Sequence, residues 1–364
     1  MDNPDQASGA FGFDGTWKEY APIAFTNLLL TIVTLGIYRF WATTRSRRYL
    51  WSRTRFIDDR LEWTGTGKEL FLGFLMVLLL LLLPIFILQF GAQALIMQGY
   101  AGIAGILSLL SFFVIFYLIG VARFRALRYR LGRTYWHGIR GGSDDGGLKY
   151  GWSYVWKTFV GYIPAGLLVP RAMMSLWNER WNHMSFGPYQ FNSQGNWHDT
   201  FKRYLLIYIA PPVAIVFGAL ILSYVRQLFV MSAVDGQGDP SLMATYAIVA
   251  ASSFILALLF MGVVNLAYYA KFFRVGVDGL SLSELDFKFS ARTVDWLKLF
   301  FGDVLLVVCT LGIGLIFLQY RHWKFFITHM EAYGEIDLDA LTQSTTTLSK
   351  HGEGLLDALD VGAF

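Results

Sequence analysis

Three long stretches without a charged side chain limit the folds open to this chain more than any other feature. They are Leu70–Phe90, which contains six consecutive leucines, Ile103–Val121 and Ala244–Ala270. Each exceeds the roughly 18 apolar residues that mark a membrane-spanning helix. Charged residues are only 15% of the chain, whereas soluble domains usually carry about 25%. The sequence therefore predicts an integral membrane protein and excludes an ordinary soluble domain.

A motif that recurs with variation organises the rest of the chain. TLGIYRFWATTRSRRY at 34–49 is related to TLGIGLIFLQYRHWKF at 310–325, and a weaker copy lies midway between them. We interpret these as three copies of one repeat unit. Each unit is an apolar helix that breaks near a glycine (Gly36, Gly166 and Gly312), followed by a short β-hairpin.

The three repeat units alternate with two transmembrane helical hairpins, which predicts an all-α polytopic membrane protein. The four firm spans are expected at about 70–93, 101–122, 204–224 and 245–269. The expected segments, in chain order, are a disordered leader at 1–12, unit one at 13–68, a transmembrane pair at 69–122, a basic linker with unit two at 123–198, a transmembrane pair at 199–270, unit three at 271–337 and a mobile tail at 338–364.

The distribution of basic residues predicts which segments face the cytoplasm, because Lys and Arg near span ends favour that side. Arginine clusters at 39–60 and 123–140 are expected inside, and the loops at 94–100 and 225–243 outside. Both transmembrane pairs then begin and end inside. Each repeat unit must therefore enter and leave on one side, as a broken, re-entrant or interfacial helix. The alternative is that the units span, giving about seven helices and an external N-terminus. The first residues carry no secretory signal, so insertion is expected to use the internal spans.

Polar residues recur at one position of the repeat. Asn27, Lys157 and Asp303 align with one another in the three units. An ionisable group in hydrocarbon is costly unless it is paired or hydrated, so such residues are functional candidates. Our hypothesis is that the units converge and that these residues share a polar centre. The simpler interpretation is that Lys157 and Asp303 reach the interface or pair for packing.

The basic residues of the first and third units also allow two interpretations. They could only fix the topology, or they could bind the headgroups of anionic membrane lipids, for which neighbouring Trp and Tyr side chains are suited. No recognisable nucleic-acid module is present, and the sequence does not fix the oligomeric state. The candidates for lipid-headgroup contact or topology are Arg45, Arg47, Arg48, Arg321 and Lys324.

Catalytic patterns are missing from the sequence. The six histidines are scattered, and His322 and His329 have no Cys or carboxylate spacing that completes a metal site. There is no nucleophile elbow, phosphate loop or dinucleotide fingerprint. The single cysteine, Cys309, lies in an apolar segment and is expected to pack there. We therefore expect no enzymatic activity, no metal and no cofactor.

Three motifs carry a resemblance to a known family. TLGIY followed by Trp41 and a string of arginines, RTYWHGIR at 133–140, and GEID at 334–337 resemble the bacterial YjgN-like inner-membrane family over roughly residues 11–338. That family is a domain of unknown function. The resemblance implies a multi-pass protein of the bacterial inner membrane and implies no activity. Phe40 stands where a proline often precedes the tryptophan in the family, so the helix break there is expected to be softer.

Two functional classes fit these observations. The first is a transporter or channel-like protein for a small solute or ion, with a polar centre made by the repeat units. The second is a membrane-organising scaffold that binds anionic lipid or a partner protein. A transporter needs a water-accessible route to Asp303 and Lys157, whereas a scaffold depends on the arginines at 45, 47 and 48.

Overall fold

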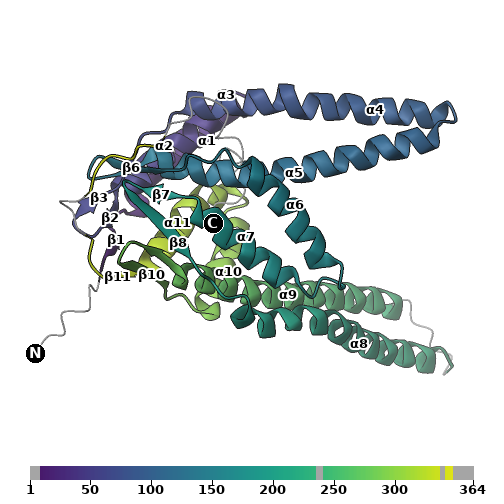
Figure 1. The fold of residues 1–364 in the computed structure, drawn as a ribbon. Coiled ribbons are helices and arrows are strands. Elements are labelled where there is room, and N and C mark those ends of the chain that lie inside the picture. Colours follow the sequence, from purple (N-terminus) through teal and green to yellow (C-terminus); the bar gives the residue numbers. More distant parts are fainter. Residues whose placement is uncertain (1–8, 235–240, 337–340, 347–364) are drawn as a thin grey trace, which may run out of the picture.

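The structure is a computed structural model that describes residues 9–234, 241–336 and 341–346. Within these residues the helices form five pairs that project to one side from a group of short strands (Figure 1). Three pairs are short and two are long, and they alternate along the chain. In order, the pairs are α1 (Trp17–Val33) with α2 (Arg39–Ser52); α3 (Gly67–Val77), η1 (Leu78–Leu82) and α4 (Leu83–Met97) with α5 (Ala101–Arg133); α6 (Leu148–Tyr162) with α7 (Val169–Asn182); α8 (His198–Val234) with α9 (Ser241–Asp278); and α10 (Thr293–Cys309) with η2 (Ile313–Phe317) and α11 (Leu318–His329).

The strands form a belt in which spatial order follows chain order. Every described pairing is antiparallel, within a sheet β1-β2-β3 and a sheet β4 to β11. Leu61 alone separates β3 from β4, and β1 lies against β11. We call this arrangement the strand belt. Its members are β1 (Phe11–Phe13), β2 (Thr54–Phe56), β3 (Asp59–Arg60), β4 (Glu62–Trp63), β5 (Thr134–Trp136), β6 (Ile139–Gly142), β7 (Ser185–Phe186), β8 (Tyr189–Ser193), β9 (Leu280–Leu282), β10 (Leu285–Phe289) and β11 (Met330–Tyr333).

Each helix pair begins and ends on two strands that are paired with each other. The strand before the first helix of a pair bonds to the strand after its second helix, as in β1 with β2, β4 with β5, β6 with β7, β8 with β9 and β10 with β11. A chain that leaves the belt through one strand must therefore return to its neighbour. All five helix pairs, short and long, start and finish on the same side of the protein.

The belt corrects the expected all-α class. The sequence predicts a short hairpin behind the second helix of each unit. In the first and second units β2-β3 and β7-β8 lie there, whereas the described residues of the third unit have only the strand β11, which pairs with β10. The sequence does not predict β5-β6 and β9-β10, which follow the long helices α5 and α9. The strands of these two hairpins are only three to five residues long, which is too short for the periodicity of a single sequence to reveal them. The chain is mostly helical with an antiparallel β component.

The short pairs turn through the same unusual backbone conformation. Leu35–Gly36, Ala165–Gly166 and Leu311–Gly312 all have positive φ, with the glycines at +91°, +82° and +92°. In the first and third pairs a threonine hydroxyl also accepts a hydrogen bond from the amide four residues later, which stabilises the turn. Left-handed backbone is costly for residues with a Cβ atom, so each glycine permits the reversal.

Three helices are long and apolar enough to cross a membrane, among the described residues: 101–133, 198–227 and 244–278. The other expected span, at about 70–93, is continuous helix from α3 to α4 but contains the π-helical turn η1, and α4 alone is shorter than a span. The turn ends two residues before Pro84. Proline lacks a donor and its ring clashes with the carbonyl four residues earlier, which favours such a local widening.

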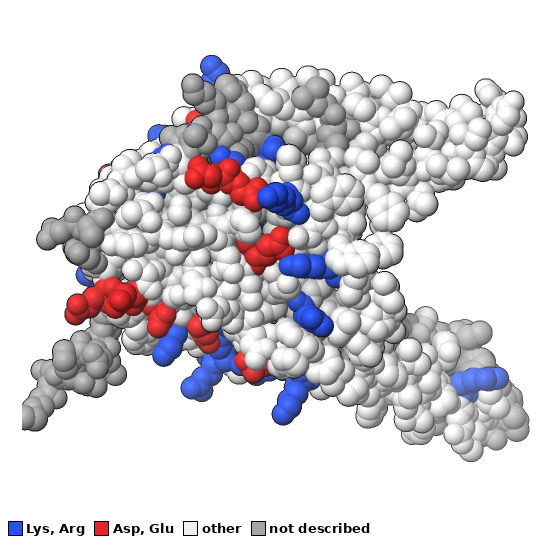
Figure 2. Space-filling view, viewed as in Figure 1, with Lys and Arg blue, Asp and Glu red and all other residues white. Residues whose placement is uncertain are grey.

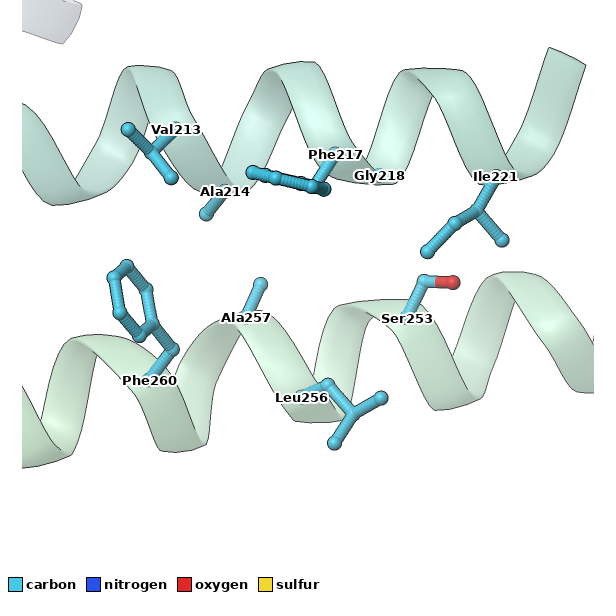
Figure 3. Close-up of a pocket in the computed structure, with 9 residues that line it drawn as sticks. All are labelled: Val213, Ala214, Phe217, Gly218, Ile221, Ser253, Leu256, Ala257 and Phe260. Atoms are coloured by element: carbon cyan, nitrogen blue, oxygen red, sulfur yellow. The ribbon is translucent and has the colours of Figure 1, made fainter.

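Small residues line an apolar space between α8 and α9. Ala214 and Gly218 on α8 lie opposite Ser253 and Ala257 on α9, as Figure 3 shows. A Cβ atom added at Gly218 would meet no atom of α9 within 4 Å, so the two helices are not in close contact at this point. Phe217 also lines this space, which leaves an apolar cavity of about 250 Å³. The packing requires no polar contact along this part of the pair.

Charge and burial divide the molecule into two regions. Figure 2 shows the acidic and basic side chains gathered around the belt, whereas the projecting long pairs are almost uncharged. Arg226 is the single charge among the described residues of 204–270. Only 6% of the most apolar window of α8, and of α9, is buried within the protein, while the aromatic core lies at the belt. The exposed helical surface therefore requires lipid contact.

The third unit closes the structure by packing against the first. The rings of Trp51 and Trp323 stack with centroids 3.9 Å apart, and Trp323 Nε1 donates to Thr54 Oγ1 at 2.9 Å. The Tyr320 hydroxyl donates to the Gly15 carbonyl at 2.9 Å. These contacts join positions about 300 residues apart in the chain. The first and last strands of the belt are therefore brought next to each other, although the described strands stay in two separate sheets.

The expected leader and tail lie mostly outside the described residues. Residues 1–8, 337–340 and 347–364 are not described, and neither are 235–240 of the loop expected outside. Within the expected leader, Phe11 and Gly12 belong to β1. Within the expected tail, Gln343 Nε2 donates to the Gly138 carbonyl at 2.9 Å, so residues 341–346 lie against the β5–β6 turn.

The first prediction concerns the glycine of the turn. Gly36→Ala should lower the free energy of unfolding by about 1–2 kcal/mol, because the new Cβ must be held at positive φ. The control is Gly91→Ala in α4, which has the same open surroundings but helical backbone and should be neutral or slightly stabilising. Thermal unfolding in detergent micelles would measure both. Equal destabilisation by the two substitutions would contradict the argument.

The second prediction concerns sidedness. In a Cys309→Ser background, cysteine at exposed Asn192 in β8 should react with a membrane-impermeant thiol reagent only after cells are permeabilised. Cysteine at Gln98, between α4 and α5, should react in intact cells. The belt lies at one end of the long pairs and Gln98 at the other, and basic residues favour the cytoplasm. Labelling of both positions from the same side would contradict the fold.

Candidate functional site

A cavity of about 750 Å³ lies among six helices between the two long pairs. It is lined by α5 and α9, one helix from each long pair, and by helices of the second and third short pairs. We call it the central slot. Its lining residues are Arg123, Tyr150, Tyr154, Thr158, Tyr162, Val169, Ala172, Met173, Leu176, Trp177, Arg180, Tyr269, Phe272, Phe273, Trp296, His322 and Phe326.

The slot follows one face of the second short pair. On α6 the lining residues recur every fourth position from Tyr150 to Tyr162, which places them in one row on the helix. Twelve residues of helix span about 18 Å. On α7 the lining runs from Val169 in the first turn to Arg180 in the last. The slot therefore extends from the strand belt to the turn of this short pair.

The base of the slot holds two guanidinium groups without acidic partners. Arg180 is only 7% exposed, and its Nε has no hydrogen-bond partner. It lies 5.6 Å from the centre of the Trp177 ring, and Arg123 lies 5.5 Å from that of Tyr154. Within the described residues, neither arginine forms an ion pair. Acidic side chains are also missing from the described lining of the slot.

The charge on Arg180 is held in an unfavourable environment. Burial lowers the pKa of its guanidinium, the Tyr150 side chain opposes this change, and the positive charge of Arg123 adds to it. Arginine nevertheless remains protonated in proteins because its reference pKa lies far above neutral pH. A buried charge without a partner costs several kcal/mol. The slot therefore carries positive charge that the fold does not neutralise.

The residues of the predicted polar centre have partners inside their own helix pairs. Asn27 Nδ2 donates to the Ala42 carbonyl and to Ser46 Oγ, both at 3.2 Å. Lys157 Nζ lies 2.5 Å from Glu179 Oε2. These contacts join α1 to α2 in the first short pair and α6 to α7 in the second.

Asp303 has two partners on α11. Its carboxylate oxygens lie 2.6 Å from Arg321 Nε and 2.6 Å from His322 Nε2. His322 also lines the central slot. The contacts of Asn27, Lys157 and Asp303 with other described residues do not join these three residues to one another, so a shared centre stays a prediction.

The predicted headgroup or topology residues fall into two groups. Arg47 is buried and lies 5.0 Å from the centre of the Trp63 ring, and Arg321 is bound to Asp303. Arg45, Arg48 and Lys324 are exposed. Only the exposed group is free to meet a lipid headgroup without rearranging the core.

Sequence reasoning placed Arg123 in a basic cluster and passed over Arg180. The usable signal was the pattern of α7, where Ala172, Met173, Leu176 and Trp177 form an apolar row that Arg180 continues. A charge within an apolar helical face is unusual. The described residues contain no group of His, Cys, Asp and Glu able to hold a metal ion.

Comparison with known proteins identifies the family. The family model described as "Bacterial protein of unknown function (DUF898)" matches residues 8–358, which is nearly the whole chain. The chain belongs to this family. It is 22% identical over 385 residues to the "Inner membrane protein YjgN" of Salmonella typhimurium, covering 96% of this chain and 94% of that protein.

Two Escherichia coli proteins with the same name match shorter regions. The protein of strain O157:H7 is 32% identical over 155 residues, covering 43% of this chain and 35% of its own length. The protein of strain K12 is 39% identical over 69 residues, covering 19% and 17%. No solved structure matches. These names and the apolar helices show an integral inner-membrane protein of the YjgN-like family, as the sequence motifs suggested.

The third prediction tests the contact between Asp303 and α11. Asp303→Asn should lower the free energy of unfolding by about 2 kcal/mol, because hydrogen bonds to charged groups contribute roughly 1.5–3 kcal/mol and the carboxylate is only 13% exposed. The control is Lys298→Met on the same helix, whose side chain is 75% exposed and which should change little. Both are measured by thermal unfolding in detergent. Equal stability of Asp303→Asn and the parent would show that the contact is dispensable.

Proposed function

We propose that the protein is a non-enzymatic inner-membrane transporter or channel-like protein that takes a small solute or ion into the central slot. The observation that supports this most strongly is the position of the slot. It lies between one helix of each long pair and extends along the whole second short pair. A substrate in the slot would therefore contact both long helix pairs, through α5 and through α9.

The short pairs support this proposal as re-entrant elements. Their turns lie away from the strand belt and expose apolar side chains, with Leu35 and Leu311 each 94% exposed and Ile163 72% exposed. Apolar tips of this kind are stable in lipid and costly in water. In this proposal the three short pairs are repeats that enter the bilayer from the cytoplasmic side and return. Non-helical backbone is tolerated at membrane depth where it lines a cavity.

A membrane-organising scaffold remains the second candidate. The observation that favours it is the exposure of Arg45 and Arg48 on α2, near the half-exposed Trp41. Basic side chains near an anionic leaflet contribute about 1 kcal/mol each. A scaffold of this type has no need for a slot that opens to water on either side.

The fourth prediction separates the two classes. A transporter must expose its substrate site to each side of the membrane in turn. In a Cys309→Ser background, Thr158→Cys in the middle of the slot should react with an impermeant thiol reagent in both inside-out and right-side-out vesicles. The matched control is Trp156→Cys on the same helix. The Trp156 side chain is 70% exposed and lies outside the lining of the slot, so a cysteine at this position should meet lipid and react from neither side.

The labelling pattern decides the proposal. Reaction of the cysteine at position 158 from only one side would favour a binding or scaffold role, and reaction from neither side would remove the slot as a solute route. The double variant Lys157→Met with Thr158→Cys would show whether the contact between Lys157 and Glu179 controls access of the reagent to position 158. The first substitution removes the ammonium group that binds Glu179 and leaves the labelled position unchanged.

A further inference from the structure

We infer that the ligand of the central slot is an anionic amphiphile, with its phosphate or carboxylate headgroup on Arg123 and Arg180 and its apolar chain along α6 and α7. This inference rests on the proposed use of the slot as a substrate site and specifies the substrate class. Three independent features of the slot lead to it: its unneutralised charge, its graded polarity and its depth.

The charge at the base requires an anion. Arg180 is more than nine-tenths buried, has a donor without a partner, and shares the slot with Arg123. Two acidic groups on helices that line the slot already have partners, since Glu179 binds Lys157 and Asp303 binds Arg321 and His322. Guanidinium groups bind phosphate and carboxylate through two parallel hydrogen bonds. An acidic headgroup would therefore supply the partner that the protein withholds.

The α7 wall above the base suits an apolar group, and the opposite α6 wall carries tyrosine rings and one threonine. Beyond Arg180 the lining of α7 is Trp177, Leu176, Met173, Ala172 and Val169, and it contains no charge. The slot extends about 18 Å along α6 by helix geometry. A free phosphate at the base could not contact the far half of this wall. Pockets of roughly 300–1,000 Å³ hold drug-sized ligands, so a cavity of about 750 Å³ suits a headgroup with a chain.

The depth of the two ends matches a lipid-like molecule. The uncharged run of α5 ends at Ala122, and Arg123 follows it directly, so this guanidinium lies where a span meets the headgroup layer. At the other end of the slot, Tyr162 and Tyr269 are 63% and 51% exposed. The slot is therefore basic and buried at the end that lies at headgroup level. Its other end is open toward the exposed apolar surfaces of the helices.

The fifth prediction is a comparison of ligands on the full-length protein in neutral detergent. Native mass spectrometry would measure binding of phosphatidylglycerol and of phosphatidylcholine with the same acyl chains. Phosphatidylglycerol should bind at least tenfold more tightly, because only its headgroup carries net negative charge. Inorganic phosphate, tested by thermal shift, should bind weakly. Tight binding of inorganic phosphate with no preference between the lipids would assign the site to a free anion and overturn the inference.

Substitutions then locate the binding. Arg180→Met and Arg123→Gln should each reduce phosphatidylglycerol binding about tenfold or more and leave phosphatidylcholine binding unchanged. The matched control is Arg171→Met, an exposed arginine at the start of the same helix, which should bind as the parent does. Equal losses in Arg171→Met and Arg180→Met would mean that lipid binds to the general basic surface and would overturn the slot assignment.

Folding and transport can be separated from this result. Arg180→Met should unfold at a temperature equal to or above that of the parent without ligand, because replacing an unpaired buried charge with an apolar residue is neutral or stabilising. Loss of binding by a variant of unchanged stability is therefore a loss of the site. Labelling of Thr158→Cys from both sides without lipid preference would keep the transport proposal and overturn this one. A preference for phosphatidylglycerol together with labelling from one side only would keep this inference and overturn the transport proposal.

Discussion

The pairing of strands at the base of each helix pair is the constraint on which the rest of the structure depends. A strand that enters a helix pair bonds to the strand that leaves it, so every excursion from the belt returns to the adjacent position. Backbone pairing of this kind cannot form across a membrane, because polar backbone groups must be satisfied where they lie. The belt therefore fixes the common direction of five helix pairs and places α5, α6, α7 and α9 around one slot.

Several parts of this architecture could be predicted from the sequence. The uncharged run Ile103–Val121 is long enough to specify a membrane span, and the corresponding helix is found at 101–133. Composition could not predict the belt, because strands such as Ser185–Phe186 contain only two residues and depend on partners far away in the chain. Nor could it predict the division of the first span, which depends on how Pro84 is accommodated within a helix that six leucines would otherwise continue.

The candidate site shows a sharper limit of sequence reasoning. Asn27, Lys157 and Asp303 are conspicuous in the sequence because they are polar residues among apolar ones, yet each has partners that it finds within its own helix pair. Arg180 was not conspicuous, although it is the residue whose charge the fold leaves unbalanced. Whether a buried charge is costly depends on its neighbours in space. Those neighbours come from α5, α6 and α7, and their meeting is a property of the belt.

The contact of the third unit with the first has a consequence for how the chain is assembled. Trp323 must reach Trp51, and β11 must reach β1, before the first and third units are in contact, and contacts of such large sequence separation form late and slowly. Until then β1 and β11 are exposed outer strands of the growing belt, and an exposed strand is a site at which another chain can pair. When β11 lies against β1, each strand covers the other, although β1 stays hydrogen-bonded to β2 and β11 to β10. The nascent chain is therefore most open to association with other chains before its last strand arrives.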